Sequence, residues 1–299
     1  MLLNEKAVLV SLNLKKWNPR KIDHALRDSV ASSYGVDSKV LSTSKKLVAL
    51  NEEVFKRIET LDGKIRNKVF YSVGQGCTGF CVPYDYKGLH LLPSELMKEF
   101  TEAFAELKDQ REREVGRVVD SWKEILEGAQ EELKGLYDPS DYPSKEEIAS
   151  RYECSWSQHH LPDEAYVGKN DYQVEDPRHG VSSSDVSEVE SRTKSTVELA
   201  TETATNNVNV LLTHLTDCLK NDKTFRDSSF DKVKNAIETF GAWNFNNNPD
   251  LSDASDILVD ALGKIDGADD LRKDSSKVDD FVDASDKASE ILNKLDGVI

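Results

Sequence analysis

Two long apolar stripes with helical spacing constrain the fold of this chain more than any other feature. In the first, apolar residues recur at three- and four-residue steps after Pro93, and a charged residue, Arg111, stands where another apolar one is expected. A helix of about 40 residues would be about 60 Å long, so a second long element or a partner must cover it. The stripe consists of Met97, Phe100, Phe104, Leu107, Val115, Val118, Trp122, Ile125, Ala129, Leu133 and Leu136.

The second stripe begins near Asp185, where Glu188 lies at the spacing of a capping box, and it continues to Leu219. A helix of about 35 residues along this stripe matches the first in length. We therefore predict that the two pack as a long antiparallel hairpin resembling a coiled coil. Its apolar members are Val186, Val189, Thr193, Val197, Ala200, Ala204, Val208, Leu211, Leu215 and Leu219.

The shorter elements complete a mainly α-helical fold. Residues 7–14 alternate apolar and polar side chains, which is typical of a half-buried strand. Residues 69–92 combine β-forming residues with turn glycines, so we expect an irregular β-hairpin there. Helices are expected over 20–33, 44–68 and, after a capping box at Ser144 and Glu147, over a short stretch ending near Tyr152.

The C-terminal part is predicted to be a helical cap. Amphipathic patterns predict helices over 229–240, 252–265 and roughly 277–295. These patterns divide the chain into three regions. They are a basic β/α region over 1–93, a hairpin region over 94–228 with an irregular connection over 138–184, and an acidic helical region over 229–299.

Charge is distributed unevenly along the sequence. The whole chain of 299 residues has a formal net charge of −16. Residues 1–93 hold 15 basic and 9 acidic residues, a net charge of +6, whereas the remainder has a net charge of −22. Such asymmetry can be neutralised within one molecule or used to stack identical subunits head to tail, and we favour these two interpretations over presentation of the basic part to an anionic partner. The negative net charge argues against direct binding to nucleic acid.

Several side chains are candidates for partner binding because they concentrate charge in short stretches. The basic candidates lie close to the predicted first strand, and the acidic candidates lie in the C-terminal cap. They are Lys15, Lys16, Arg20, Lys21, Asp269, Asp270, Asp279, Asp280 and Asp283.

The sequence has few signs of a metal or cofactor. Cys77, Cys81, His159 and His160 are the only candidate metal ligands, and they lack the two-residue spacing of a zinc knuckle. Residues 74–79 match a dinucleotide-binding glycine pattern, but the extended run ending at Pro83 leaves no room for the required helix. We expect no cofactor.

Catalytic motifs and membrane segments are also not found. No histidine belongs to a known nucleophilic motif, and the acidic residues occupy polar helix faces, so a non-enzymatic protein is expected. The apolar runs are about four residues long, far below the roughly 20 that span a bilayer. Four cysteines do not make a disulfide framework, which indicates a reducing cytoplasm.

Short motifs spread along most of the chain resemble a family of phage and prophage proteins, a bacterial domain of unknown function. Their order and spacing carry the resemblance more than any one of them, and the chain departs from the pattern at Tyr84, where a Trp is common. The motifs include Trp17 with Arg20-Lys21, Val82-Pro83-Tyr84-Asp85, Asp138-Pro139, Asp141-Tyr142-Pro143, Asn248-Pro249-Asp250-Leu251 and Leu271-Arg272-Lys273-Asp274.

The resemblance implies a genetic context rather than a reaction. Members of that family are often encoded beside a MoxR-type AAA+ ATPase and a protein with a von Willebrand factor A domain. This implies a non-enzymatic adaptor for such a system in the host cytoplasm. The alternatives are a DNA mimic that inhibits a host defence nuclease, and a structural or assembly component of the virion.

Overall fold

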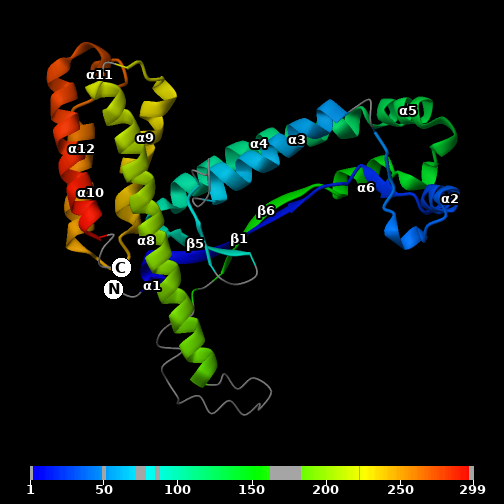
Figure 1. Cartoon of the computed structure of the whole chain (residues 1–299), viewed down its shortest axis with the longest axis horizontal. Coiled ribbons are helices and arrows are strands. Elements are labelled where there is room, and N and C mark those ends of the chain that lie inside the picture. Colours follow the sequence, from blue (N-terminus) through cyan, green and yellow to red (C-terminus); the bar gives the residue numbers. More distant parts are fainter. Residues whose placement is uncertain are drawn as a thin grey trace. The chain divides into compact units, whose positions relative to one another are not determined.

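The computed structural model describes residues 3–48, 52–71, 79–84, 88–159, 161, 183–221 and 223–295 (Figure 1). It is mainly α-helical with a small antiparallel sheet, as the sequence predicts. The chain divides into two compact units that interleave in sequence. Unit 1 comprises residues 1–11, 70–100 and 158–299, and unit 2 comprises residues 12–69 and 101–157. This division differs from the three consecutive regions expected from the sequence.

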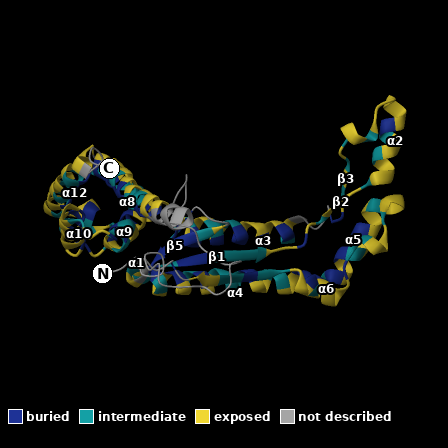
Figure 2. Cartoon of the chain, turned by 90° about the horizontal axis from the view of Figure 1, so that it is seen from below, coloured by how far each residue is buried: buried dark blue, intermediate teal, exposed yellow. Residues whose placement is uncertain are grey.

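Unit 2 is built around helices α3 (Glu52–Lys64) and α4 (Met97–Asp120). They lie side by side along β1 (Ala7–Lys15) (Figure 1 and Figure 2). The far end of the unit holds a small core in which the indole rings of Trp17 and Trp122 meet edge to face at 5.2 Å. The core consists of Trp17, Leu47, Val48, Phe55, Ile58, Val118, Trp122, Ile125 and Ile148.

Two expected helices in unit 2 are shorter than predicted. Residues 20–22 form β2 (Arg20–Ile22), which pairs with β3 (Ser44–Lys46) in a two-stranded antiparallel ribbon. Helix α2 (His24–Tyr34) follows and ends at Gly35, whose φ of 64° is the left-handed conformation that glycine adopts readily. A 3₁₀ turn, η1 (Ser38–Val40), lies before β3. Strand pairing between distant residues therefore overrides the local helical pattern.

The first long stripe is a bent helix and not a continuous one. α4 ends at Asp120, and α5 (Trp122–Leu133) continues in a different direction (Figure 2). The hydrogen bond from Ile125 N to Ser121 O, at 2.9 Å, continues the helical pattern across the bend. Trp122 is anchored by its indole nitrogen, which donates to Pro143 O at 3.0 Å. The buried indole thus fixes the new direction of the chain.

Short elements follow α5. They include the 3₁₀ turns η4 (Lys134–Leu136) and η5 (Pro139–Asp141), and helix α6 (Lys145–Ser150). The predicted capping box of α6 is confirmed, because Ser144 accepts from Glu147 N and the Glu147 carboxylate accepts from Ser144 N. Strand β6 (Glu153–His159) comes next and is the outer neighbour of β1.

Unit 1 contains the remaining strands and the first part of β1, over residues 7–11. The predicted first strand is confirmed as β1, which pairs antiparallel with β5 (Leu89–Pro93) from Ala7 opposite Pro93 to Ser11 opposite Leu89. β5 also pairs antiparallel with β4 (Val82–Pro83). Residues 65–70, before this hairpin, form the π-helical turn η2 (Ile65–Phe70), whereas an extended run had been expected from Val69 onward. A 3₁₀ turn, η3 (Ser94–Leu96), leads into α4.

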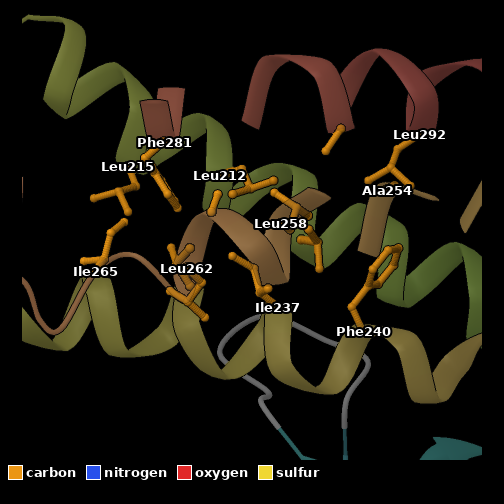
Figure 3. Packing of buried hydrophobic residues seen from close by; sticks show 14 of the residues in the cluster. Leu212, Leu215, Ile237, Phe240, Ala254, Leu258, Leu262, Ile265, Phe281 and Leu292 are labelled. Carbon is orange, nitrogen blue, oxygen red and sulfur yellow. The ribbon is translucent and has the colours of Figure 1, made fainter. Parts of the chain in front are cut away.

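The rest of unit 1 is a helical bundle. It consists of α8 (Ser183–Lys220), α9 (Asp227–Phe240), η6 (Gly241–Trp243), α10 (Pro249–Leu262), α11 (Asp270–Lys273) and α12 (Ser275–Leu295). Leu212 and Leu215 of α8 pack against Ile237 of α9, Leu258 of α10 and Phe281 of α12 (Figure 3). Exposed residues follow the outer faces of α10 and α12 (Figure 2). The predicted C-terminal helices are therefore present, with boundaries shifted by two or three residues.

The structure does not show the expected long hairpin between the two stripes. The apolar side of α8 packs on α9 and α12, which form the bundle with it, so the C-terminal cap supplies the cover that α4 had been expected to provide. α4 instead places Arg111 and Val118 within unit 2. Among the described side chains, periodicity indicated most of the apolar face of each helix but not the element that covers it. Leu136 is 46% exposed, and the side chains of Val186, Val189 and Thr193 lie outside the described part of the chain.

The first helical turn of the chain, α1 (Leu3–Lys6), is tied to this bundle. The ammonium group of Lys6 donates to the carbonyl oxygens of Asn244 and Phe245 at 3.1 and 2.9 Å, and to Asn247 Oδ1 at 2.5 Å. These acceptors satisfy all three donors of the ammonium group.

In the part of the chain that the structure describes, no helix is both long and apolar enough to cross a bilayer.

Candidate functional site

Most of the predicted basic candidates are neutralised within their own unit. Lys15 pairs with Glu153 at 2.6 Å and Lys16 with Glu59 at 2.7 Å, while Lys21 binds Asp141. Arg20 is exposed, and no ion pair joins it to another described residue. The basic N-terminal region therefore does not present these lysines as a free cationic surface.

Asp141 is the most buried of the acids that hold these lysines. Its side chain is 2% exposed and lies between Lys21 and Lys45, with the Lys45 ammonium 2.6 Å from Oδ2. Burial acts to raise the pKa of this carboxyl, but hydrogen bonds from the two lysines outweigh burial and hold the pKa below its usual value. The hydrogen bond to Asp141 correspondingly raises the pKa of Lys21. The cluster pins β2 and β3 to η5, which is a structural role.

The predicted acidic candidates fall into two groups. Asp269 accepts from Arg272 and Lys273, both at 2.9 Å, and Asp270 pairs with Lys277 at 2.6 Å. Hydrogen bonds from these cations, first of all from Lys273 and Lys277, lower the pKa of both carboxyls. Asp269 and Asp270 thus stabilise the connection around α11.

Asp279, Asp280 and Asp283 behave differently, because all three are exposed on α12 and form no ion pair with any described residue. Asp286, one turn further along, is neutralised by Lys220 at 2.8 Å. α10 has four exposed acids that are likewise unpaired within the described ranges, and three of them lie beyond its first turn. The six acids together, called the acidic face below, are Asp253, Asp256, Asp260, Asp279, Asp280 and Asp283.

The net charge of the chain belongs almost entirely to one unit. Unit 1 has 18 basic and 33 acidic residues, a net charge of −15, whereas unit 2 has 21 and 22, a net charge of −1. When the charges are summed along the sequence, the chain has a basic N-terminal part and an acidic remainder. When they are summed over the two compact units, unit 2 is nearly neutral and unit 1 is strongly acidic.

The candidate metal ligands are not brought together among the described residues. Cys81 is fully buried and burial raises the pKa of its thiol, while the exposed ring of His159 shares a hydrogen bond of 2.9 Å with Ser11 Oγ. Cys77 and His160 lie outside the described residues, so the expectation that these four candidates bind no metal stays untested there. Among the residues that are described, no group of three or more His, Cys, Asp or Glu is placed to hold a metal ion.

Of the glycine pattern at residues 74–79, Gly79 is described, and its environment explains why it is glycine. Its N–H donates to Tyr71 O at 2.8 Å. A Cβ at this position would lie 2.6 Å from the carbonyl carbon of Phe70 and 2.7 Å from the backbone nitrogen of Tyr71. The close approach of two backbones therefore accounts for this glycine.

Sequence reasoning missed a cationic groove in unit 2. It has a volume of about 300 Å³ and lies between α3 and α4. Four of its lining residues are basic, and each helix contributes them at three- or four-residue steps or multiples of these, which places them on one face. The helical spacing of these basic residues is present in the sequence, but the residues are divided between two helices that are distant in sequence. The groove is lined by Arg57, Thr60, Leu61, Lys64, Gln110, Arg113, Glu114 and Arg117.

Comparison with protein-family models, with curated proteins and with solved structures finds no match for this chain.

Proposed function

We propose that this chain is a non-enzymatic binding or assembly protein that docks a basic partner protein on the acidic face of α10 and α12. One observation carries the proposal: the six acids of this face have no ion-pair partner among the described residues, although neighbouring acids such as Asp270 and Asp286 do. The acids that stabilise the fold through ion pairs are therefore different from the acids that are available to bind a partner.

Electrostatics supports a binding role for this face. Six uncompensated carboxylates in a unit of net charge −15 repel one another, which disfavours the compact state slightly. A partner with a complementary basic surface relieves this repulsion and is attracted at long range, so association is fast and depends on salt. A rigid helical bundle holds the carboxylates in fixed positions for such docking.

The resemblance to the phage and prophage protein family suggests the identity of the partner. Proteins that resemble this chain are often encoded beside a MoxR-type AAA+ ATPase and a von Willebrand factor A protein. We therefore propose that the partner belongs to such an ATPase system in the host cytoplasm, and that this chain acts as its adaptor.

Copurification tests this proposal. The tagged chain, coexpressed with a MoxR-type ATPase and a von Willebrand factor A protein of the kind encoded beside proteins that it resembles, is expected to retain at least one of them at about 0.15 M salt. A variant with all six acids of the acidic face changed to Asn should lose the partner.

The matched control removes six other exposed acids, which also have no ion-pair partner in the described ranges, from α4, α5 and α6. Its substitutions are Glu102→Gln, Asp109→Asn, Asp120→Asn, Glu124→Gln, Glu131→Gln and Glu146→Gln. This control should keep the partner. Recovery of the wild-type chain alone, or equal loss in both variants, would refute docking through the acidic face.

A DNA mimic is the second candidate, favoured by the spacing of the acids at steps of three and four residues on α10. The seven helical steps from Asp253 to Asp260 cover about 10 Å, whereas one turn of DNA covers about 34 Å. The short row therefore favours a local basic patch over a full DNA-binding cleft. Competition with duplex DNA for a host nuclease, lost in the six-acid variant, would support the mimic instead.

A further inference from the structure

We propose that the α3–α4 groove of unit 2 binds a phosphate group, and that Glu114 makes it prefer phosphate to sulfate. The site is separate from the acidic face, so it can be tested independently of the proposed partner. Its lining is strongly cationic, with Arg57, Lys64, Arg113 and Arg117 against the single carboxylate of Glu114. Such a lining is unusual in a unit whose net charge is −1.

Three of the four cations of the groove have no close ion pair with a described residue, whereas Arg117 is held by Glu114 at 2.6 Å. Within the described residues, Lys64 and Arg113 form no ion pair. Arg57 reaches Glu53 only at 4.0 Å, the limit of an ion pair. Elsewhere in unit 2, Lys15, Lys16, Lys21 and Lys45 are each held by an acid from a distant part of the chain. The groove therefore keeps unused cationic donors in one place.

The donor geometry suits an oxyanion of small size. A guanidinium presents a planar fork of N–H groups that matches the oxygens of a phosphate, and a lysine ammonium adds a point charge. Gln110 uses one N–H on Glu106 at 3.2 Å and retains a second. The volume of about 300 Å³ is at the lower end of ligand sites, which favours a phosphate group over a whole dinucleotide.

Glu114 adds a second requirement for the ligand. Its Oε1 accepts from Arg117 Nη1 at 2.6 Å, but its Oε2 is buried and accepts no hydrogen bond from any described residue. A buried carboxylate oxygen without a donor is costly, and an ionised carboxylate can only accept. The matching ligand is thus an anion that also carries a donor. Near pH 7, inorganic phosphate keeps a P–O–H group, whereas sulfate has none.

Calorimetric titration of the full chain at pH 7 and about 0.15 M salt tests the proposal, with inorganic phosphate, glycerol phosphate and sulfate as separate ligands. Phosphate is expected to bind about tenfold more tightly than sulfate, because only phosphate can donate to Glu114. Tighter binding of inorganic phosphate than of glycerol phosphate would assign the free ion as the ligand. The reverse order would assign a phosphate ester whose own hydroxyl group donates to Glu114, because a phosphate monoester has lost most of its P–O–H proton at pH 7.

Variants identify the residues responsible. Arg113→Gln and Lys64→Gln should each weaken phosphate binding about tenfold, and Glu114→Gln should bring the ratio between phosphate and sulfate close to one. Lys123→Gln, which removes one cation from a side chain 89% exposed on α5, is the matched control and should bind like the wild type. Circular dichroism checks that each variant is folded.

Three results would overturn the proposal. They are no phosphate binding by the folded wild type, equal binding of phosphate and sulfate, or the same loss in Lys123→Gln as in Arg113→Gln. The last result would mean that binding reflects only the general charge of the unit.

Discussion

The guanidinium of Arg111 donates from Nε to Oδ1 of Asp62 at 2.6 Å, with only 1% and 3% of the two side chains exposed. Its Nη2 also donates to Lys15 O at 2.8 Å, and its guanidinium carbon lies 5.7 Å from the ring centre of Tyr152. One side chain thus joins α3, α4 and β1. This explains the charged residue that interrupts the first apolar stripe.

Loss of Arg111 should be among the most damaging substitutions in unit 2. Arg111→Leu leaves the Asp62 carboxylate buried without its cation, so we expect the free energy of unfolding to fall by about 3–5 kcal/mol. The double variant with Asp62→Leu removes both charges and should be more stable than Arg111→Leu alone. Urea unfolding measures both, and Lys123→Leu, at an exposed position, should change stability by less than about 0.5 kcal/mol. A double variant less stable than the single one would contradict this account.

Gly79 and Gly116 should respond in opposite ways to alanine. Gly79→Ala forces a methyl group against the backbone of Phe70 and Tyr71, which should cost about 1–3 kcal/mol. Gly116 lies inside α4, and a methyl group added there would meet nothing within 4 Å, so Gly116→Ala should stabilise by up to about 1 kcal/mol. Thermal unfolding of the two variants compares them directly. An equal effect of both would mean that the close approach at Gly79 is not rigid.

Asp141 should contribute a pH-dependent part of the stability. Its pKa is lower in the folded protein than its ordinary value of 3.8, so it stabilises the fold above that pH and this contribution disappears as the pH falls through the folded value. Asp141→Asn should therefore cost about 1–3 kcal/mol at pH 7 and progressively less below pH 3.8. Urea unfolding across the acid range checks this, with Asp109→Asn as the exposed control. A difference between variant and wild type that is constant with pH would exclude the ion-pair explanation.

The bundle of unit 1 should depend on the buried side of α8. Leu215 is fully buried against α9 and α12, so Leu215→Ala should lower stability by about 2–5 kcal/mol through lost contacts and a residual cavity. Val210 on the same helix is 67% exposed, and Val210→Ala should change stability by less than about 0.5 kcal/mol. Denaturant unfolding of both variants tests which side of α8 is covered, and a larger effect at Val210 would contradict the observed packing.

Local signals in the sequence predicted the elements whose causes are local. The strand over residues 7–14 follows from alternation, and α6 follows from the capping box of Ser144 and Glu147. The ribbon of β2 and β3 could not be predicted in this way, because its pairing joins residues 24 positions apart, as with Lys21 opposite Lys45. Both strands lie at the start of segments whose apolar spacing fits a helix, and only the pairing with a distant partner decides between helix and strand.

The prediction of binding surfaces from the sequence is limited in the same way. The sequence shows where charged residues are, but it does not show which of them form ion pairs in the folded chain. Lys15 is neutralised by Glu153, 138 positions away, and Asp286 by Lys220. Unpaired charges therefore become visible only after folding, as with Asp279 on α12 and Arg113 in the groove. Net charge by segment is a poor guide to such surfaces in a chain whose units interleave.

The contact between Lys6 and the loop before α10 has a consequence for biosynthesis. Lys6 emerges from the ribosome more than 230 residues before Asn244 and Phe245, which accept its hydrogen bonds. Domains fold as units during synthesis, so the segments of unit 2, over 12–69 and 101–157, are all available before unit 1 is complete. The first turn of the chain must wait for almost the last helices to be made. Premature termination before residue 244 would leave α1 without the acceptors of Lys6.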